Sequence, residues 1–147
     1  MHFEIPGNLL DSLRQRRDSR PADEIETRED AFLLHPGLGP ALYLTSDGRI
    51  LRDGREWGET AIVEGTDDDA VAAIVIGAEN WSLPELLKLL PTPPCNAVSC
   101  SQCEGSRWWS IKDYYGKPAK VICPACGGYA WLSSNGVKFG VVSGKST

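Results

Sequence analysis

Between residues 41 and 64 the apolar and polar positions alternate as they do in β-strands. Two such runs, 41–45 and 49–52, flank Asp47-Gly48, a dipeptide that favours a tight hairpin turn. A third run, "TAIVE" at 60–64, follows shortly afterwards. The pattern therefore predicts a β-hairpin followed by one further strand.

Apolar positions at helical spacing predict an amphipathic helix at each end of the segment before residue 91. The first helix has Asn8 as its expected N-cap and an apolar face of Leu9, Leu10 and Leu13. The second, "SLPELLKLLP", begins with Ser82 as the expected cap, has Pro84 in its first turn and stops at Pro91. Its core face consists of Leu86, Leu87, Leu89 and Leu90.

The segment "TDDDAVAAIVIG" predicts a helix start followed by a buried strand. Thr66 is the expected cap, the three aspartates at 67–69 suit the first helical turn, and residues 74–76 form the apolar strand. Three carboxylates also suit a hard cation, but a helix start already explains them. "DSRPADEIETRED" at 18–30 is polar and predicts an exposed connection. These elements together predict a compact α+β domain.

Charge and cysteine content change sharply near residue 91. Before Cys95 there are nine Lys and Arg against eighteen Asp and Glu, a formal charge of −9, whereas from Cys95 onward six oppose two, giving +4. All five cysteines lie in this second part, and Pro91, Pro93 and Pro94 form a stiff joint in front of them. We therefore expect an acidic α+β domain at 1–91, a Pro-rich linker at 92–99 and a small β-rich zinc-ribbon module at 100–147.

Composition restricts the classes of protein to which the chain can belong. It has no run of eighteen apolar residues, so we expect no transmembrane helix, and its first residues lack the pattern of a secretory signal. A cytoplasmic location is the default expectation. With a sequence pI near 5.0, general nucleic-acid binding by the whole chain is disfavoured. We find no nucleophile elbow or phosphate-binding loop, and His35, the one internal histidine, fits a capping or solvent-facing role.

The second part repeats one motif, Cys-x-x-Cys-x-Gly-x-x-Trp, at residues 100–108 and 123–131. The two Cys-x-x-Cys pairs are separated by nineteen residues, a spacing typical of four-cysteine zinc sites. Two tight turns can direct four sulfurs at one tetrahedral ion, and a bound zinc stabilises a module too small to fold on its apolar core alone. The sequence predicts one structural Zn²⁺ with the ligands Cys100, Cys103, Cys123 and Cys126, with iron in the same thiolate site or paired disulfides as the alternatives.

The glycines and tryptophans of the motif predict how the cysteine turns are shaped and covered. Gly105 and Gly128 suit the positive φ with which the chain leaves each turn, and Trp108 and Trp131 are placed to cover the metal. Cys95 fits a free thiol at the joint better than a fifth ligand. "WWSIKDYYGKPAKVI" predicts two strands around a turn at 116–118, and Asn135-Gly136 predicts a further hairpin.

The two Cys-x-x-Cys-x-Gly motifs resemble the cysteine-rich zinc domain of DnaJ-type co-chaperones over residues 100–131. That resemblance implies a local zinc-hairpin architecture. The family motif ends in a second glycine, where this chain has Arg107 and Ala130, and the family uses four motifs for two zinc ions. Because the J-domain His-Pro-Asp is also missing, with His35-Pro36-Gly37 the nearest sequence, co-chaperone activity does not follow.

The first part is similar to the small α+β proteins of the SUKH superfamily, many of which are bacterial toxin-immunity proteins. The similarity rests on the "ALYLTSDGRIL" hairpin and on "IVIGAENWSLPELLKLL". It implies neutralisation of a toxin as one alternative function.

We expect a non-enzymatic adaptor that binds a protein partner, because a closed four-cysteine site leaves no position at which to activate water. Aromatic and basic residues between the motifs favour a partner contact. The candidate contact residues are Arg107, Trp109, Lys112, Tyr114, Tyr115 and Lys117. The same residues suit single-stranded nucleic acid as an alternative, and Cys-x-x-Cys pairs also occur in thiol-disulfide oxidoreductases. The acidic part is equally suited to dock a basic partner.

Overall fold

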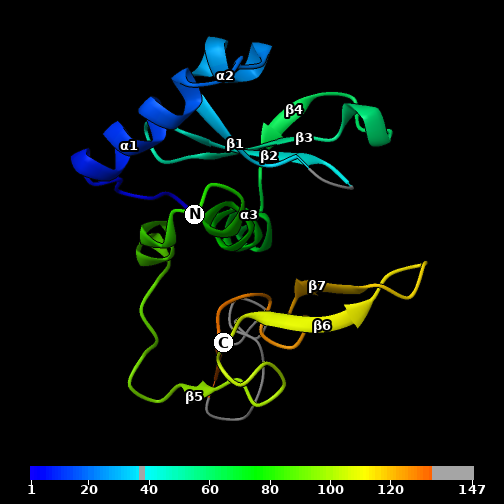
Figure 1. Cartoon of the computed structure of the whole chain (residues 1–147). Coiled ribbons are helices and arrows are strands. Elements are labelled where there is room, and N and C mark those ends of the chain that lie inside the picture. The colour runs from blue at the N-terminus through cyan, green and yellow to red at the C-terminus, as the bar shows by residue number, and fades with distance from the viewer. Residues whose placement is uncertain (37–38, 134–147) are drawn as a thin grey trace. The chain divides into compact units, whose positions relative to one another are not determined.

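The computed structural model describes residues 1–36 and 39–133 and divides the chain into two compact units, Met1–Leu90 and Pro91–Thr147 (Figure 1). Unit 1 combines helices with a four-stranded sheet, whereas unit 2 contains two small antiparallel sheets and the cysteine cluster. The chain is thus a mixed helix and sheet protein. Among its described residues no helix combines the length and the apolar character that crossing a membrane requires.

The sheet of unit 1 is antiparallel throughout, with the strand order β1-β2-β3-β4. The predicted hairpin and third strand are confirmed as β2 (Ala41–Thr45), β3 (Ile50–Asp53) and β4 (Ile62–Glu64). Gly48 in the hairpin turn has a φ of +92°, and an added Cβ would collide with the Phe3 carbonyl, so this turn requires glycine. The edge strand β1 (Ala31–His35) was not predicted.

Helices cover both faces of this sheet, with α2 (Glu24–Glu29) on one side and α3 (Asp67–Asn80) on the other (Figure 1). Helix α1 (Gly7–Asp18) lies along β1, where the Arg17 guanidinium covers the Phe32 ring and the Arg16 side chain donates to the Trp81 carbonyl just after α3. Strand alternation separates two sets of buried side chains. Ala31, Tyr43 and Leu51 pack with Ile25 of α2. Leu34 lies on the opposite face, so close to Gly77 of α3 that a Cβ there would be 2.9 Å from the Leu34 side chain.

Helix α3 corrects the prediction of a strand at 74–76, because the helix runs unbroken through these residues to Asn80. Thr66 is its N-cap, as predicted: the Thr66 hydroxyl accepts from the Asp69 N–H, and the Asp69 carboxylate accepts from the Thr66 N–H. Burial against the sheet outweighs the β-propensity of Ile and Val in the segment. The buried residues recur at helical spacing: Ala70, Val71, Ala73, Ile74, Val75, Gly77 and Ala78.

The predicted exposed connection at 18–30 also contains a helix, α2, so that prediction is wrong for residues 24–29. A capping box between Asp23 and Glu26 starts the helix. The Glu26 side chain is fully buried and accepts from both Nη atoms of Arg20, at 2.8 and 2.7 Å, and from the Leu33 N–H at 2.8 Å. The Glu26 carboxylate thus pairs with Arg20 in the connection before α2 and joins α2 to β1 through the Leu33 N–H.

Two predicted caps are also corrected. Pro6 occupies the N-cap of α1, so Asn8 lies inside the helix, while Leu9 and Leu13 are buried as expected. The segment Pro84–Leu89 is a 3₁₀ helix (η2) that begins after Leu83 instead of Ser82. A shorter 3₁₀ helix, η1 (Arg55–Trp57), follows β3.

The described residues of unit 2 form four short strands in two antiparallel pairs. β6 (Trp108–Lys112) pairs with β7 (Pro118–Ile122), which are the two strands predicted between the motifs, and β5 (Val98–Ser99) pairs with β8 (Trp131–Leu132). β5 lies in the segment for which we expected a linker. The hairpin predicted at Asn135-Gly136 lies outside the described residues.

Candidate metal centre

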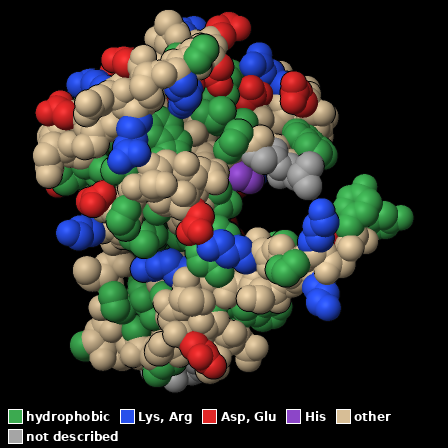
Figure 2. Space-filling model, in the orientation of Figure 1, with side chains coloured by type: hydrophobic (Ala, Val, Ile, Leu, Met, Phe, Trp, Pro, Cys, Tyr) green, Lys and Arg blue, Asp and Glu red, His purple; other side chains and the backbone are tan. Residues whose placement is uncertain are grey.

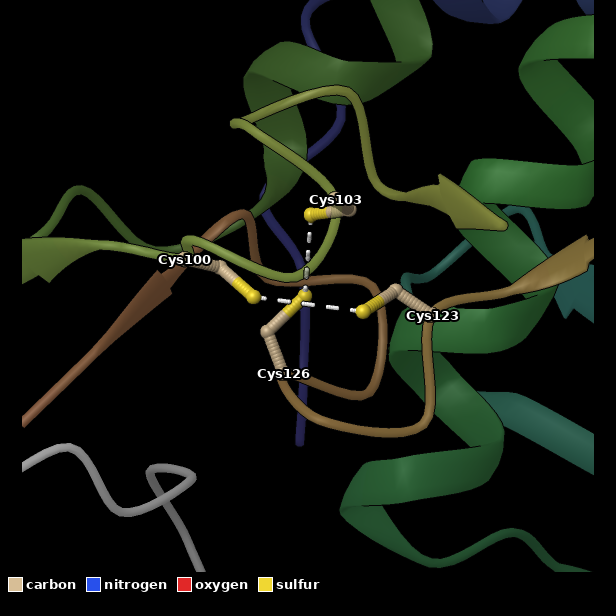
Figure 3. A group of neighbouring side chains, drawn as sticks. All are labelled: Cys100, Cys103, Cys123 and Cys126. Atoms are coloured by element: carbon tan, nitrogen blue, oxygen red, sulfur yellow. Dashed lines mark hydrogen bonds between the residues drawn. The ribbon is translucent and has the colours of Figure 1, made fainter. Parts of the chain in front are cut away.

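The two Cys-x-x-Cys motifs bring four cysteine sulfurs together, as the sequence predicts (Figure 3). All four Sγ atoms lie within 4.8 Å of one another, and all four cysteines are buried. The Cys100 and Cys123 sulfurs are 3.9 Å apart and the Cys103 and Cys126 sulfurs 3.7 Å. Since a tetrahedron with metal–sulfur bonds of about 2.3 Å has edges of about 3.8 Å, these thiols match a four-thiolate metal site.

The two turns that carry the cysteines have matching backbone conformations at positions 23 residues apart. Gly105 and Gly128 have φ of +79° and +95°, as their places in the motif lead one to expect. Arg107 and Ala130 are also left-handed, with φ of +77° and +75°. These two residues occupy the position where the DnaJ-type motif has its second glycine, so this chain has the left-handed backbone there without the glycine.

Backbone hydrogen bonds join the turns reciprocally. The Cys100 N–H donates to the Ala130 carbonyl at 3.0 Å, and the Cys123 N–H donates to the Arg107 carbonyl at 2.9 Å. The strands are paired between the two turns in the same way. β6 follows the first turn and pairs with β7, which precedes the second turn. β5 precedes the first turn and pairs with β8, which follows the second turn. Neither turn is completed by its own flanking strands, so the cysteine cluster depends on both.

Arg107 adds a side-chain link that its counterpart Ala130 lacks. The Arg107 Nη1 donates to the Gly128 carbonyl at 2.6 Å, which connects the first turn to the second. Burial lowers the pKa of the Arg107 guanidinium, while the nearby Cys126 and Cys103 thiolates favour its charged form. A cation is therefore held beside the cysteine sulfurs.

The residues that cover the cluster differ from those predicted. Leu132 is buried with the cysteines, and Trp109 and Ala125 pack against them. The prediction that Trp108 and Trp131 cover the site is wrong because neighbouring strand residues point to opposite faces, which directs Trp109 and Leu132 inward. The Trp108 ring instead lies under Lys120, whose Nζ is 4.6 Å from the ring centroid.

Burial and the proximity of the sulfurs control the ionisation of the thiols. Burial raises the pKa of Cys126 to about 12 and also raises the pKa of Cys123. At Cys103 burial opposes ionisation as well, but the backbone N–H groups of Arg107 and Gly105, together with neighbouring thiols, lower the pKa. Four adjacent thiolates need a compensating charge, which a divalent cation supplies.

The remaining candidate contact residues lie on the β6–β7 hairpin. The turn places two tyrosines at the tip with Tyr114 95% and Tyr115 80% exposed, and Lys112 and Lys117 are exposed beside them. The Asp113 carboxylate accepts from the Tyr115 and Lys117 N–H groups and so fixes the turn. Arg107 and Trp109, in contrast, contact the interior of the module.

The other sequence candidates lie apart from the cysteine cluster. Cys95 is exposed and lies outside the cluster. Among the triple aspartate, Asp67 pairs with the N-terminal amine and Asp69 with Arg52, each at 3.0 Å. His35 is partly buried at the end of β1 instead of solvent-facing, and its Nδ1 has no hydrogen-bond partner among the described residues.

No protein-family model matches the chain, and no curated protein or solved structure shows significant similarity to it. The resemblances to DnaJ-type zinc domains and to SUKH proteins thus gain no support beyond the residues that suggested them. The structure shows four clustered cysteines that are positioned to bind a metal ion in a mixed helix and sheet protein.

Proposed function

We propose that this chain is a non-enzymatic adaptor in which one structural Zn²⁺ holds unit 2 together and the β6–β7 hairpin contacts a protein partner. The observation that carries the proposal is the convergence of four buried sulfurs on matching turns. Zinc fits because it favours tetrahedral thiolate coordination. Four protein thiolates fill that coordination, which leaves no open position for a substrate or an activated water.

The hairpin is the part of unit 2 best suited to a partner. Figure 2 shows hydrophobic side chains at its end, with Lys and Arg side chains close by. Tyr114 and Tyr115 expose almost their whole side chains, and aromatic residues commonly dominate binding energy at protein interfaces. Because the cysteine cluster fixes the base of the hairpin through Trp109, metal binding and partner binding are expected to be coupled.

Native mass spectrometry and affinity capture test the two parts of this proposal. We expect one Zn²⁺ per chain and none in Cys123→Ser. The zinc-loaded protein should retain a protein partner that is lost from Cys123→Ser and from the double variant Tyr114→Ser/Tyr115→Ser. Trp57→Ser is the matched control, since Trp57 is an exposed aromatic residue of unit 1.

Two outcomes contradict the proposal. Capture of the same partner by the Tyr114→Ser/Tyr115→Ser variant excludes the hairpin as the contact. Zinc-free protein that reduces insulin disulfides with turnover, and loses this activity in Cys123→Ser, favours the oxidoreductase alternative.

A further inference from the structure

The β6–β7 hairpin has one apolar face and one basic face. Strand register places Trp109 opposite Val121 and Ile111 opposite Ala119, so these four side chains share one face. Ile111 and Val121 remain 41% and 40% exposed. Lys112 and Lys120 project from the other face, together with Trp108.

The outer edge of β6 exposes backbone groups that can pair with another strand. The Cys123 N–H bond to Arg107 and the Asp113 N–H bond to Lys117 show that the odd-numbered residues of β6 bond to β7. Even-numbered residues therefore point their N–H and C=O groups outward. The Ser106 hydroxyl contacts both of these groups on Trp108, at 3.3 and 3.1 Å, so that Ser110 and Lys112 are the positions of β6 whose outward groups are open among the described residues.

The opposite edge is less suitable. β7 begins with Pro118, which has no N–H to donate, and proline is a common way to block an edge strand. An added strand is consequently expected on β6.

We propose that β6 accepts an extended polypeptide segment in which apolar and acidic residues alternate. The segment pairs with the open backbone groups of Ser110 and Lys112. Because side chains alternate along a strand, its apolar residues extend the face of Ile111 and Val121, while its carboxylates on the other face meet Lys112 of the neighbouring strand. This inference rests on the proposed function and names the chemistry of the partner.

The geometry favours a polypeptide over single-stranded nucleic acid. The Tyr114 and Tyr115 rings are 5.3 Å apart and at 89° to each other, whereas successive stacked bases need parallel rings. The Trp108 ring is covered by Lys120. The apolar face of Ile111 and Val121 also has no role in binding a phosphate backbone.

Fluorescence anisotropy with the zinc-loaded full chain tests the inference. The probe is a labelled seven-residue peptide that alternates Glu and Val, and its control has the same composition with the Glu and Val residues in separate blocks. We expect the alternating peptide to bind about tenfold more tightly than the blocked one, because both peptides offer the same backbone groups but only the alternating one places all its apolar side chains on one face and all its carboxylates on the other. In hydrogen exchange, the peptide should protect the Ser110 and Lys112 amides.

Two variants separate backbone pairing from general attraction. Ser110→Pro removes an outward N–H and should weaken binding about tenfold, whereas Ser110→Ala keeps that N–H and should bind like the wild type. Lys112→Glu should weaken binding by reversing a charge. Zinc content is measured for each variant. If Ser110→Pro loses its zinc, protection of the Ser110 and Lys112 amides in the wild type decides the question.

Three results overturn the inference. The first is equal affinity for the alternating and blocked peptides, and the second is amide hydrogen exchange at Ser110 and Lys112 that the peptide does not change. The third is tighter binding of a dT15 oligonucleotide than of the peptide, which supports the nucleic-acid alternative. Self-association of the free chain that displaces the peptide would assign the edge to a second copy. If a captured partner depends on Tyr114 and Tyr115 but not on Ser110, the inference fails while the proposed function stands.

Discussion

Unit 1 and unit 2 bury very different side chains. Unit 1 has a core of aliphatic and aromatic residues drawn from its helices and its sheet. In the described part of unit 2 the buried side chains are the four cysteines, Tyr129 and Leu132. Unit 1 can therefore be stabilised by removing apolar surface from water, whereas the described part of unit 2 buries little such surface and is expected to depend on its cysteines.

The two units also differ in how their buried negative charge is neutralised. In unit 1 the buried Glu26 carboxylate is neutralised by an Arg20 side chain that the fold itself supplies. In the described part of unit 2 four cysteine sulfurs lie together with Arg107 beside them, so a bound cation is expected to supply most of the charge that neutralises their thiolates. Stability is thus expected to depend on zinc in one unit only.

Loss of zinc is expected to give the largest effect. Cys123→Ser, or a zinc chelator, should remove about 10 kcal/mol of apparent stabilisation and unfold unit 2 while unit 1 stays folded. Amide hydrogen exchange followed by NMR checks this: Trp109 and Val121 should lose protection, and Phe32 and Leu44 should keep theirs. Cys95→Ser is the control, because Cys95 is exposed and should be replaceable without effect. Protected Trp109 and Val121 amides in Cys123→Ser would contradict the proposed role of the metal.

Breaking the ion pair of the buried Glu26 carboxylate is expected to give an intermediate effect. Glu26→Gln should destabilise unit 1 by about 1–2 kcal/mol, since it weakens the hydrogen bonds from Arg20 and Leu33 while the Arg20 guanidinium, 38% exposed, is still partly hydrated. Urea unfolding followed at unit 1 resonances measures this, and zinc content should not change. Glu24→Gln is the matched control, because Glu24 lies in the same helix but its ion pair with Arg28 is exposed.

The effect of Glu26 should also depend on pH. Burial disfavours its ionised form, but Arg20 and the N–H groups of Leu33 and Asp23 outweigh burial and lower the pKa below its ordinary value of 4.5. The stabilisation is therefore complete above about pH 4.5 and is lost as the pH falls through the lowered pKa. If the difference in unfolding free energy between the wild type and Glu26→Gln increased as the pH fell, the pKa of Glu26 would be raised instead.

The smallest effects should distinguish the two cysteine turns. Ala130→Gly relieves a left-handed backbone and should stabilise zinc binding by about 1 kcal/mol. Arg107→Gly relieves the same conformation but removes the hydrogen bond to Gly128 and a charge near the sulfurs, so it should weaken binding by about 1 kcal/mol. Competition with a chromogenic zinc chelator measures both. If both variants changed the zinc affinity in the same direction, the Arg107 side chain would add nothing to the site.

Local sequence signals predicted the parts of this structure that depend on neighbouring residues. Asp47-Gly48 sets the hairpin turn, Thr66 caps α3, and the cysteine spacing brings four sulfurs together. Each of these features is decided within a few residues or by a fixed ligand geometry. Asp23-x-x-Glu26 carries a similar capping signal for α2, but its surrounding charges suggested an exposed segment instead.

Features set by distant contacts were harder to predict. Residues 74–76 have the composition of a strand, yet packing of α3 against the sheet keeps them helical. The aligned Trp108 and Trp131 suggested a cover for the metal, but pairing of β6 with β7 and of β5 with β8 directs the next residue of each strand inward. Arg107 had no signal of its own, since its bond to Gly128 crosses between the turns.

The exchanged pairing of strands in unit 2 has a consequence for biosynthesis. The second cysteine turn follows the first by 23 residues, so at about 5–20 residues per second the ribosome delivers it roughly one to five seconds later. During that interval the nascent chain offers only two of the four cysteine ligands, and β5 has no partner strand because β8 has not been synthesised. Zinc capture in a growing polypeptide is therefore expected only after Leu132 has emerged, so that metal loading follows the synthesis of both cysteine turns.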